Sequence, residues 1–112
     1  MRRGFTLVET LVALVLVQFG LLAVAAASAI AARDIATATR VTHAREAARE
    51  RIETLRATAC VAAVEGNRSV GAMTEHWSVR GDTVRIVRDS VDYALPRGRR
   101  GRLVLEQVVW CG

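Results

Sequence analysis

The chain has 112 residues and a net charge of +5, with 16 basic against 11 acidic residues, and only 4% of its residues are aromatic. This length leaves room for a membrane helix and one small, mostly aliphatic domain, and it excludes a large catalytic core. The sequence contains no nucleophile elbow, zinc-protease motif, glycine-rich phosphate loop or paired acids. We therefore expect a protein that is not an enzyme and needs no cofactor.

The first element is a long apolar run. From Thr10 to Ala32 there are 23 consecutive residues without a charge and without a proline. As an α-helix this run would be about 34 Å long, which is enough to cross a bilayer with some tilt. We expect a membrane-spanning helix here.

Glu9 is an acid at the start of this apolar run. An ionised carboxylate inside a membrane costs about 2.5 to 3.5 kcal/mol at the centre and less near the interface. A nearby cation would offset that cost. Up to residue 32 the sequence offers Arg2, Arg3 and, if the chain is cut after Gly4, the new α-amino group of Phe5.

Basic residues followed by Gly4-Phe5-Thr6-Leu7-Val8-Glu9 and a long apolar helix resemble the processing signal of type IV pilins and type II secretion pseudopilins. The resemblance covers about the first 30 residues. It implies that residues 1–4 are a leader, that a prepilin peptidase cuts after Gly4, and that Phe5 is then N-methylated. It also implies that Glu9 pairs with the amino terminus of a neighbouring subunit in a filament. The partners implied are other pilin or pseudopilin subunits and the inner-membrane assembly platform.

Two other interpretations of the apolar run stay open. A secretory signal could be cut near Ala26-Ala27-Ser28-Ala29, although its apolar core would be unusually long. In the other interpretation, the run is a plain signal anchor and the side chain of Glu9 reaches the membrane–water interface. In a membrane-anchored chain, Arg2 and Arg3 favour a cytoplasmic amino terminus, a single pass through the bacterial inner membrane, and a periplasmic remainder.

Residues 33–64 continue the helical pattern but become amphipathic. Apolar residues recur at steps of three and four, with one doubled step, at Ile35, Ala38, Val41, Ala48, Ile52, Leu55 and Ala59. With residues 5–32 as the membrane half, we predict one helix from about Thr6 to about Val64. Its second half is expected to pack on a sheet, and a coiled-coil partner is the alternative.

Residues 65–112 show the alternation of β-strands. The pattern predicts strands over 74–80, 83–95 and 102–110, with a turn at Gly81-Asp82 and a bulge at Asp89-Ser90. Trp77 and Val79 are expected on one face. The predicted fold class is α+β, with one long helix on an antiparallel sheet of about three strands, which is also what the resemblance to pilins implies.

The chain has two cysteines, Cys60 and Cys111. An even number in a small extracytoplasmic domain favours a disulfide, which would close a loop of about 51 residues and add about 4 kcal/mol of stability. His43 and His76 have no metal-site spacing relative to the cysteines, so no metal centre is expected. The resemblance to pilins also implies a disulfide near the carboxyl terminus.

Four arginines, Arg97, Arg99, Arg100 and Arg102, lie in a glycine-containing loop. Such a cluster could bind the phosphates of DNA, as in a minor pilin for DNA uptake, or it could be a solvated loop. The solvated loop is favoured because few aromatic residues lie nearby for base stacking. With the small size of the chain, the pattern as a whole resembles a minor pilin or minor pseudopilin. The sequence does not decide between secretion, pilus and competence machines.

Overall fold

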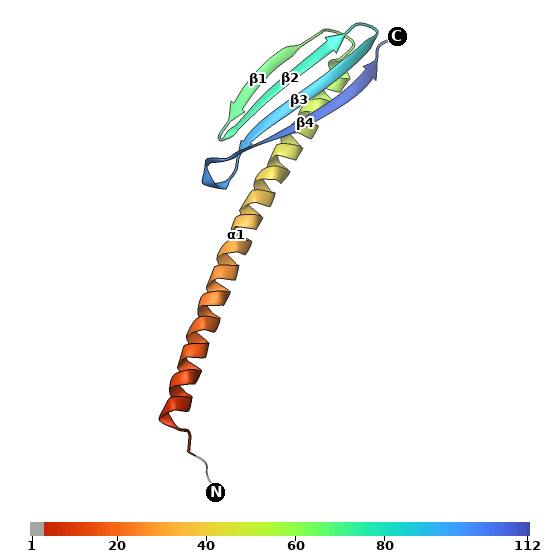
Figure 1. Ribbon diagram of the computed structural model, residues 1–112. Helices are drawn as coiled ribbons and strands as arrows, with labels where there is room; N and C mark the ends of the chain where they lie inside the picture. Colours follow the sequence, from red (N-terminus) through yellow and green to blue (C-terminus); the bar gives the residue numbers. More distant parts are fainter. Residues whose placement is uncertain (1–3) are drawn as a thin grey trace. The chain divides into compact units, whose positions relative to one another are not determined.

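The structure is a computed structural model, and it describes residues 4–112 (Figure 1). The elements are one helix, α1 (Leu7–Thr58), and four strands, β1 (Glu65–Val70), β2 (Met73–Gly81), β3 (Val84–Ala94) and β4 (Arg100–Trp110), with a short 3-10 turn, η1 (Pro96–Gly98), between β3 and β4. The α+β prediction is confirmed. The chain divides into two compact units, one ending at Ile35 and one spanning Ala36–Gly112.

The first unit is the amino-terminal part of α1. Every large apolar side chain from Phe5 to Ile30 is exposed, with exposed fractions between 48% at Val15 and 82% at Phe5. By length and composition, this helix could cross a membrane. The predicted apolar helix is thus present, and its side chains are left without a cover by residues 4–112.

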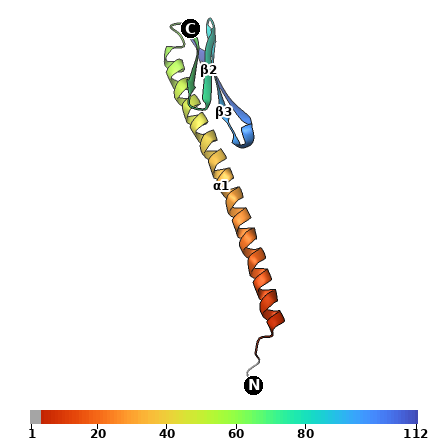
Figure 2. The ribbon, with the colours of Figure 1, turned by 90° about the vertical axis from the view of Figure 1, so that its left-hand side faces the viewer.

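The second unit is a four-stranded antiparallel sheet with the later part of α1 on one face (Figures 1 and 2). The strands are ordered β1-β2-β3-β4, so each one pairs with its neighbour in sequence. Gly81 adopts a positive φ of 109° just before the tight turn between β2 and β3, where the sequence predicted a turn. This meander needs no long crossover connection.

The prediction of three strands was short by one, because residues 65–70 form β1 at the edge of the sheet. Gly, Asn and Ser in this stretch are poor strand formers, so the sequence signal was weak. The pairing depends on a tertiary contact. Gly66 lies opposite Trp77, and a Cβ atom on Gly66 would come within 2.6 Å of the indole Cζ2. Glycine therefore makes room for the indole ring.

The helix ends at Thr58, earlier than the predicted Val64. The sequence contains no glycine or proline before Gly66 that would end it, so the cause is tertiary. Ala59 is buried, Cys60 is bonded to Cys111, and the Val64 carbonyl accepts a hydrogen bond from the Val79 amide at 2.7 Å. These contacts draw the chain away from the helix axis and into the sheet.

The bulge predicted at Asp89-Ser90 is wrong. Trp77 faces Asp89 and His76 faces Ser90 in an unbroken register, and β4 continues the same regular pairing on the other side of β3. Asp89 therefore keeps its place in the inward alternation of the strand. Its side chain points into the core instead of bending out of the ladder.

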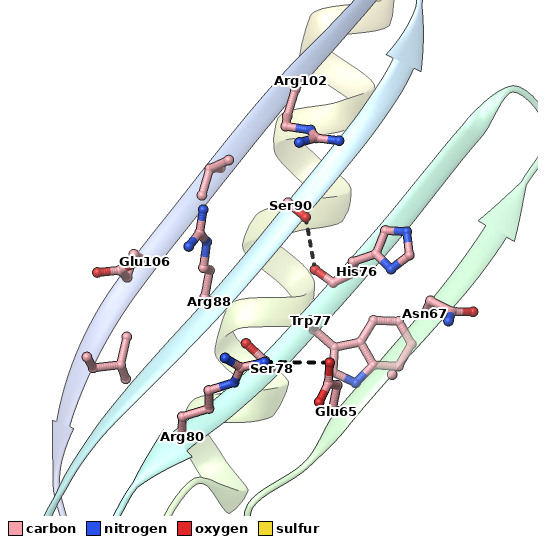
Figure 3. A pocket seen from close by; sticks show the side chains of 13 residues that line it. Glu65, Asn67, His76, Trp77, Ser78, Arg80, Arg88, Ser90, Arg102 and Glu106 are labelled. Carbon is pink, nitrogen blue, oxygen red and sulfur yellow. Dashed lines mark hydrogen bonds and ion pairs between the residues drawn. The ribbon is translucent and has the colours of Figure 1, made fainter.

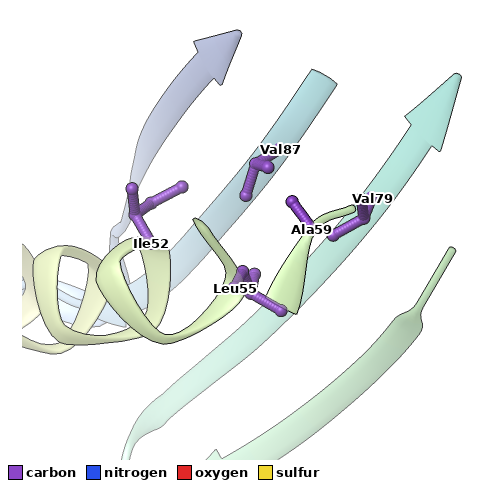
Figure 4. Close-up of a cluster of buried hydrophobic side chains, with 5 residues drawn as sticks. All are labelled: Ile52, Leu55, Ala59, Val79 and Val87. Carbon is purple, nitrogen blue, oxygen red and sulfur yellow. The ribbon is translucent and has the colours of Figure 1, made fainter. Parts of the chain in front are cut away.

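The core lies between α1 and the inner face of the sheet. One cluster joins Ile52, Leu55 and Ala59 to Val79 and Val87 (Figure 4), and a second joins Ala44 and Ala48 to Val91. The predicted stripe is buried from Ala48 onward, whereas Ile35 and Ala38 are exposed. Ala44, which is fully buried, lies in the seven-residue gap between Val41 and Ala48 in the predicted stripe. The alanines allow the helix to approach the sheet closely.

The two cysteines form a disulfide, with a Cα–Cα distance of 5.3 Å across a sequence separation of 51 residues. It joins the turn that follows α1 to the residue that follows β4. In the same region the Cys111 amide donates to the Thr83 carbonyl at 2.9 Å. The bridge therefore attaches the last strand to the end of the helix.

Replacing both cysteines by serine is expected to lower the free energy of unfolding by about 4 kcal/mol, because the loop closed by the bridge then regains its freedom in the unfolded chain. Urea unfolding of the full chain in mild detergent, followed by tryptophan fluorescence, measures this loss. Reduced wild-type protein should behave like the double variant. An unfolding midpoint equal to that of the oxidised wild type would contradict the role given to the bridge.

Candidate assembly site and buried charges

The processing signal predicted from the sequence lies just before the helix. Gly4, Phe5 and Thr6 are outside α1, which begins at Leu7. The Thr6 hydroxyl oxygen accepts a hydrogen bond from the Glu9 amide at 3.3 Å, and the Thr10 amide donates to the Thr6 carbonyl at 3.2 Å. Thr6 is thus the N-cap of the helix. The predicted cut after Gly4 falls in non-helical chain, two residues before this cap.

Sequence reasoning missed the cap, although its signal is present. Thr6 and Glu9 have the spacing of a capping box, in which the residue three positions after the cap is an acid or amide. An acid in the first turn is also favoured by the helix dipole. Glu9 can therefore stabilise the start of α1, which is an effect separate from the assembly role that the sequence predicts for it.

The Glu9 carboxylate is exposed and forms no ion pair within residues 4–112. Phe5, the predicted first residue of the processed chain, is 82% exposed. Arg2 and Arg3, on which the predicted orientation depends, lie outside the described residues. The described part of the chain thus leaves the acid of the apolar helix available to a cation from another molecule.

The folded unit contains a second acid that is almost fully buried, Glu75 on β2. Arg51 of α1 donates from Nε to Glu75 Oε1 at 3.2 Å, and Arg68 of β1 approaches Oε2 at 3.0 Å. The Arg51 guanidinium also stacks over the Trp77 ring, 4.0 Å from its centroid. One arginine from the helix and one from the edge strand therefore compensate this buried charge.

Asp89 on β3 forms no ion pair with a described residue, and the charges of Arg51 and Arg68 offset the cost of its burial only in part. Its side chain is fully buried, and neither carboxylate oxygen has a hydrogen-bond partner in the described structure. It points inward between Val87 and Val91, and so between the two apolar clusters. Burial, and secondly the charge of Glu75, raise the pKa of Asp89 to about 7. The carboxyl is therefore largely protonated in the fold at mildly acidic pH.

The outer face of the sheet is hollowed (Figure 3). The hollow has a volume of about 680 Å³, and polar side chains from all four strands line it. Arg80 forms an ion pair with Glu65 at 3.7 Å, and the Ser90 hydroxyl donates to the His76 carbonyl at 3.4 Å. The Ser90 hydroxyl is thus bonded to a backbone carbonyl, and the His76 side chain lies exposed on the outer face. The arrangement does not pair a nucleophile with a base.

The four arginines of the predicted anion patch do not act as one group. Arg102 makes a two-pronged pair with Asp92, at 2.6 Å and 3.1 Å, and this pairing lowers the pKa of Asp92. Arg97, Arg99 and Arg100 are exposed in and beside η1. The structure therefore separates three outward-facing loop cations from one strand cation that already has a partner.

No group of three or more metal-ligating side chains is found among the residues that the structure describes. Cys60 and Cys111 are joined to each other, so neither is a free thiolate. His43 lies 3.7 Å from Glu46 on the exposed side of α1.

Comparisons of the chain with models of protein families, with curated proteins and with solved structures gave no match. The architecture itself, a long amino-terminal apolar helix with its later part packed on a small antiparallel sheet, is pilin-like.

Replacing Asp89 by Asn is expected to stabilise the fold at neutral and alkaline pH. The folded pKa, about 7, lies above the ordinary value of 3.8. The contribution of protonated Asp89 to the free energy of unfolding is therefore fully present below about pH 4. The wild type loses this contribution as the pH rises to about 7. The variant should gain on the order of 4 kcal/mol over the wild type above pH 7 and progressively less below it.

Urea unfolding of the full chain in detergent between pH 4 and pH 8 measures this difference. Asp82→Asn, at an exposed position in the turn between β2 and β3, is the matched control, because water solvates that charge in both states. A constant difference between Asp89→Asn and the wild type across this pH range would show that the buried carboxyl does not titrate as argued.

Proposed function

We propose that the protein is a subunit of a filament of the type IV pilus or type II secretion class, in a minor position, and that it acts by assembly and not by catalysis. The observation that carries the proposal is an uncovered apolar helix whose first turn holds one acid, Glu9, directly after the sequence Gly4-Phe5. The pilin-like architecture supports it as well.

In the proposed assembly, α1 first holds the protein in the inner membrane, with the folded unit on the periplasmic side. A prepilin peptidase removes residues 1–4 and methylates the new amino group of Phe5. The assembly platform then draws the helix from the membrane into a bundle of like helices. There the exposed side chains from Phe5 to Ile30 would be covered by neighbouring subunits.

The electrostatic step of the proposal is the pairing of Glu9 with a neighbour's amino terminus. In a bundle of apolar helices a lone carboxylate and a lone ammonium group are each costly, whereas together they offset much of that cost. Only one axial position of the neighbouring helix brings the two charges together. The pair would thus set the register between subunits.

Glu9→Gln keeps the hydrogen-bonding capacity of a capping box but removes the charge, so it separates the two roles of this residue. We expect incorporation into filaments to fall by at least about a hundred-fold, because removal of one partner leaves a buried charge unpaired. Glu9→Asp should retain part of the activity. The measurement is the amount of subunit in sheared filaments, or copurifying with other filament subunits, divided by its amount in the membrane.

Thr6→Val is the matched control, since it removes the cap hydrogen bond and leaves the charge of Glu9 in place. It should be incorporated at close to the wild-type level. If Glu9→Gln is incorporated as well as the wild type, the chain is better described as a periplasmic domain on a plain membrane anchor.

A further inference from the structure

The loop between β3 and β4 is an ordered, basic structure. Arg97 and Gly98 have positive φ values of 64° and 70°, and the Leu95 amide closes the loop by donating to the Arg99 carbonyl at 2.8 Å. Arg97, Arg99 and Arg100 are exposed, and none forms an ion pair with a described residue. Three cations without an ion-pair partner among the described residues are thus presented at a closed turn.

A contact with α1 shows which end of the folded unit carries this loop. Arg40 donates from Nη1 to the carbonyl of Ala94, the last residue of β3, at 3.1 Å. Arg40 follows Ala32 by eight residues in the sequence. The loop therefore projects from the end of the unit that is nearest in the chain to the apolar segment. We call Arg40, Arg97, Arg99 and Arg100 the basic end.

An apolar groove lies beside the basic end. Its volume is about 310 Å³, and Arg40, Val70, Met73 and Tyr93 are among the residues that line it. Val70, in the hairpin between β1 and β2, is 51% exposed. Cations around an apolar hollow are the side chains that suit the boundary between lipid headgroups and water.

We propose that the basic end binds the phosphates of anionic phospholipids at the membrane surface while the subunit waits in the membrane before assembly. The inference depends on the membrane anchoring in the proposed function, and it adds a lipid partner for a surface outside the apolar segment. The attraction of an anionic surface for arginine side chains falls off within about one Debye length, roughly 8 Å at physiological salt, so it acts where the basic end meets the lipid headgroups.

DNA phosphates are the competing partner, and two features of the structure count against them. Arg102 is already paired with Asp92, so the four arginines of the loop do not form one patch. The aromatic residues of the described chain also offer little open stacking surface at this end. Tyr93 packs against Gly101, and Trp110 lies at the far end of β4, opposite Val84. Single-strand and loop recognition depends on such aromatic platforms.

The test is native mass spectrometry of the full chain ejected from nanodiscs that contain equal amounts of phosphatidylcholine and phosphatidylglycerol. We expect phosphatidylglycerol to be enriched roughly five-fold among the lipids that stay bound, and the enrichment to fall in high salt. In the variant with Arg97, Arg99 and Arg100 all changed to Gln, the ratio should approach that of the bulk lipid. The control changes the exposed residues Arg49, Arg56 and Arg88 to Gln, which removes the same charge elsewhere and should keep the enrichment.

Equal enrichment in the loop variant and the wild type would overturn the proposal, since the anionic lipid would then bind elsewhere on the chain. The proposal would also be overturned if the lipids bound to the wild type had the same composition as the bulk lipid. In that case, binding of a short DNA duplex by the wild type in the same nanodiscs, lost in the loop variant, would identify DNA as the partner instead. Failure of the chain to enter nanodiscs at all would instead remove the membrane anchor, and with it both this inference and the proposed function.

Discussion

The constraint on which the rest of the structure depends is an apolar helix that its own chain does not cover. The described residues bury no large side chain between Phe5 and Ile30. At about 25 cal/mol per Å² of apolar surface, leaving such a segment in water would cost more than the small folded unit could compensate. Lipid and neighbouring helices are the two covers that the proposed function assigns to this segment. The proposed function supplies both covers in sequence, first the membrane and then the filament.

The folded unit places its buried charges in two different ways. Glu75 is held by Arg51 and Arg68, which come from α1 and β1, so its burial links the helix to the edge of the sheet. Asp89 is buried between two aliphatic clusters with no hydrogen-bond partner for its oxygens, and its pKa is raised to about 7. Glu75 and its two arginines thus link the helix to the sheet. Asp89, which has no ion-pair partner among the described residues, lowers the stability of the fold once the pH rises above the mildly acidic range.

The sequence predicted the elements with strong periodicity. The apolar helix, its amphipathic continuation through Ala48, Ile52 and Leu55, and the strands over 74–80, 83–95 and 102–110 follow from spacing alone. It failed where a tertiary contact overrides a weak local signal. Trp77 packs over Gly66 and so favours the pairing of β1 with β2, and the Cys60–Cys111 bridge helps to end α1. At Asp89 the pairing of β2 with β3 is regular and has no bulge. The Thr6 cap was recognisable from the capping-box spacing. The pairing of Arg102 with Asp92 was not, because it depends on strand register.

The central claim is that Phe5 becomes a free amino terminus that can neutralise an acid such as Glu9 in a neighbouring subunit. Mass spectrometry of the amino-terminal peptide of the protein from its own host tests this claim most directly. The account predicts a peptide that begins at Phe5 and is heavier by one methyl group. A peptide that keeps Met1, or one that begins after a cut near Ala29, would contradict it.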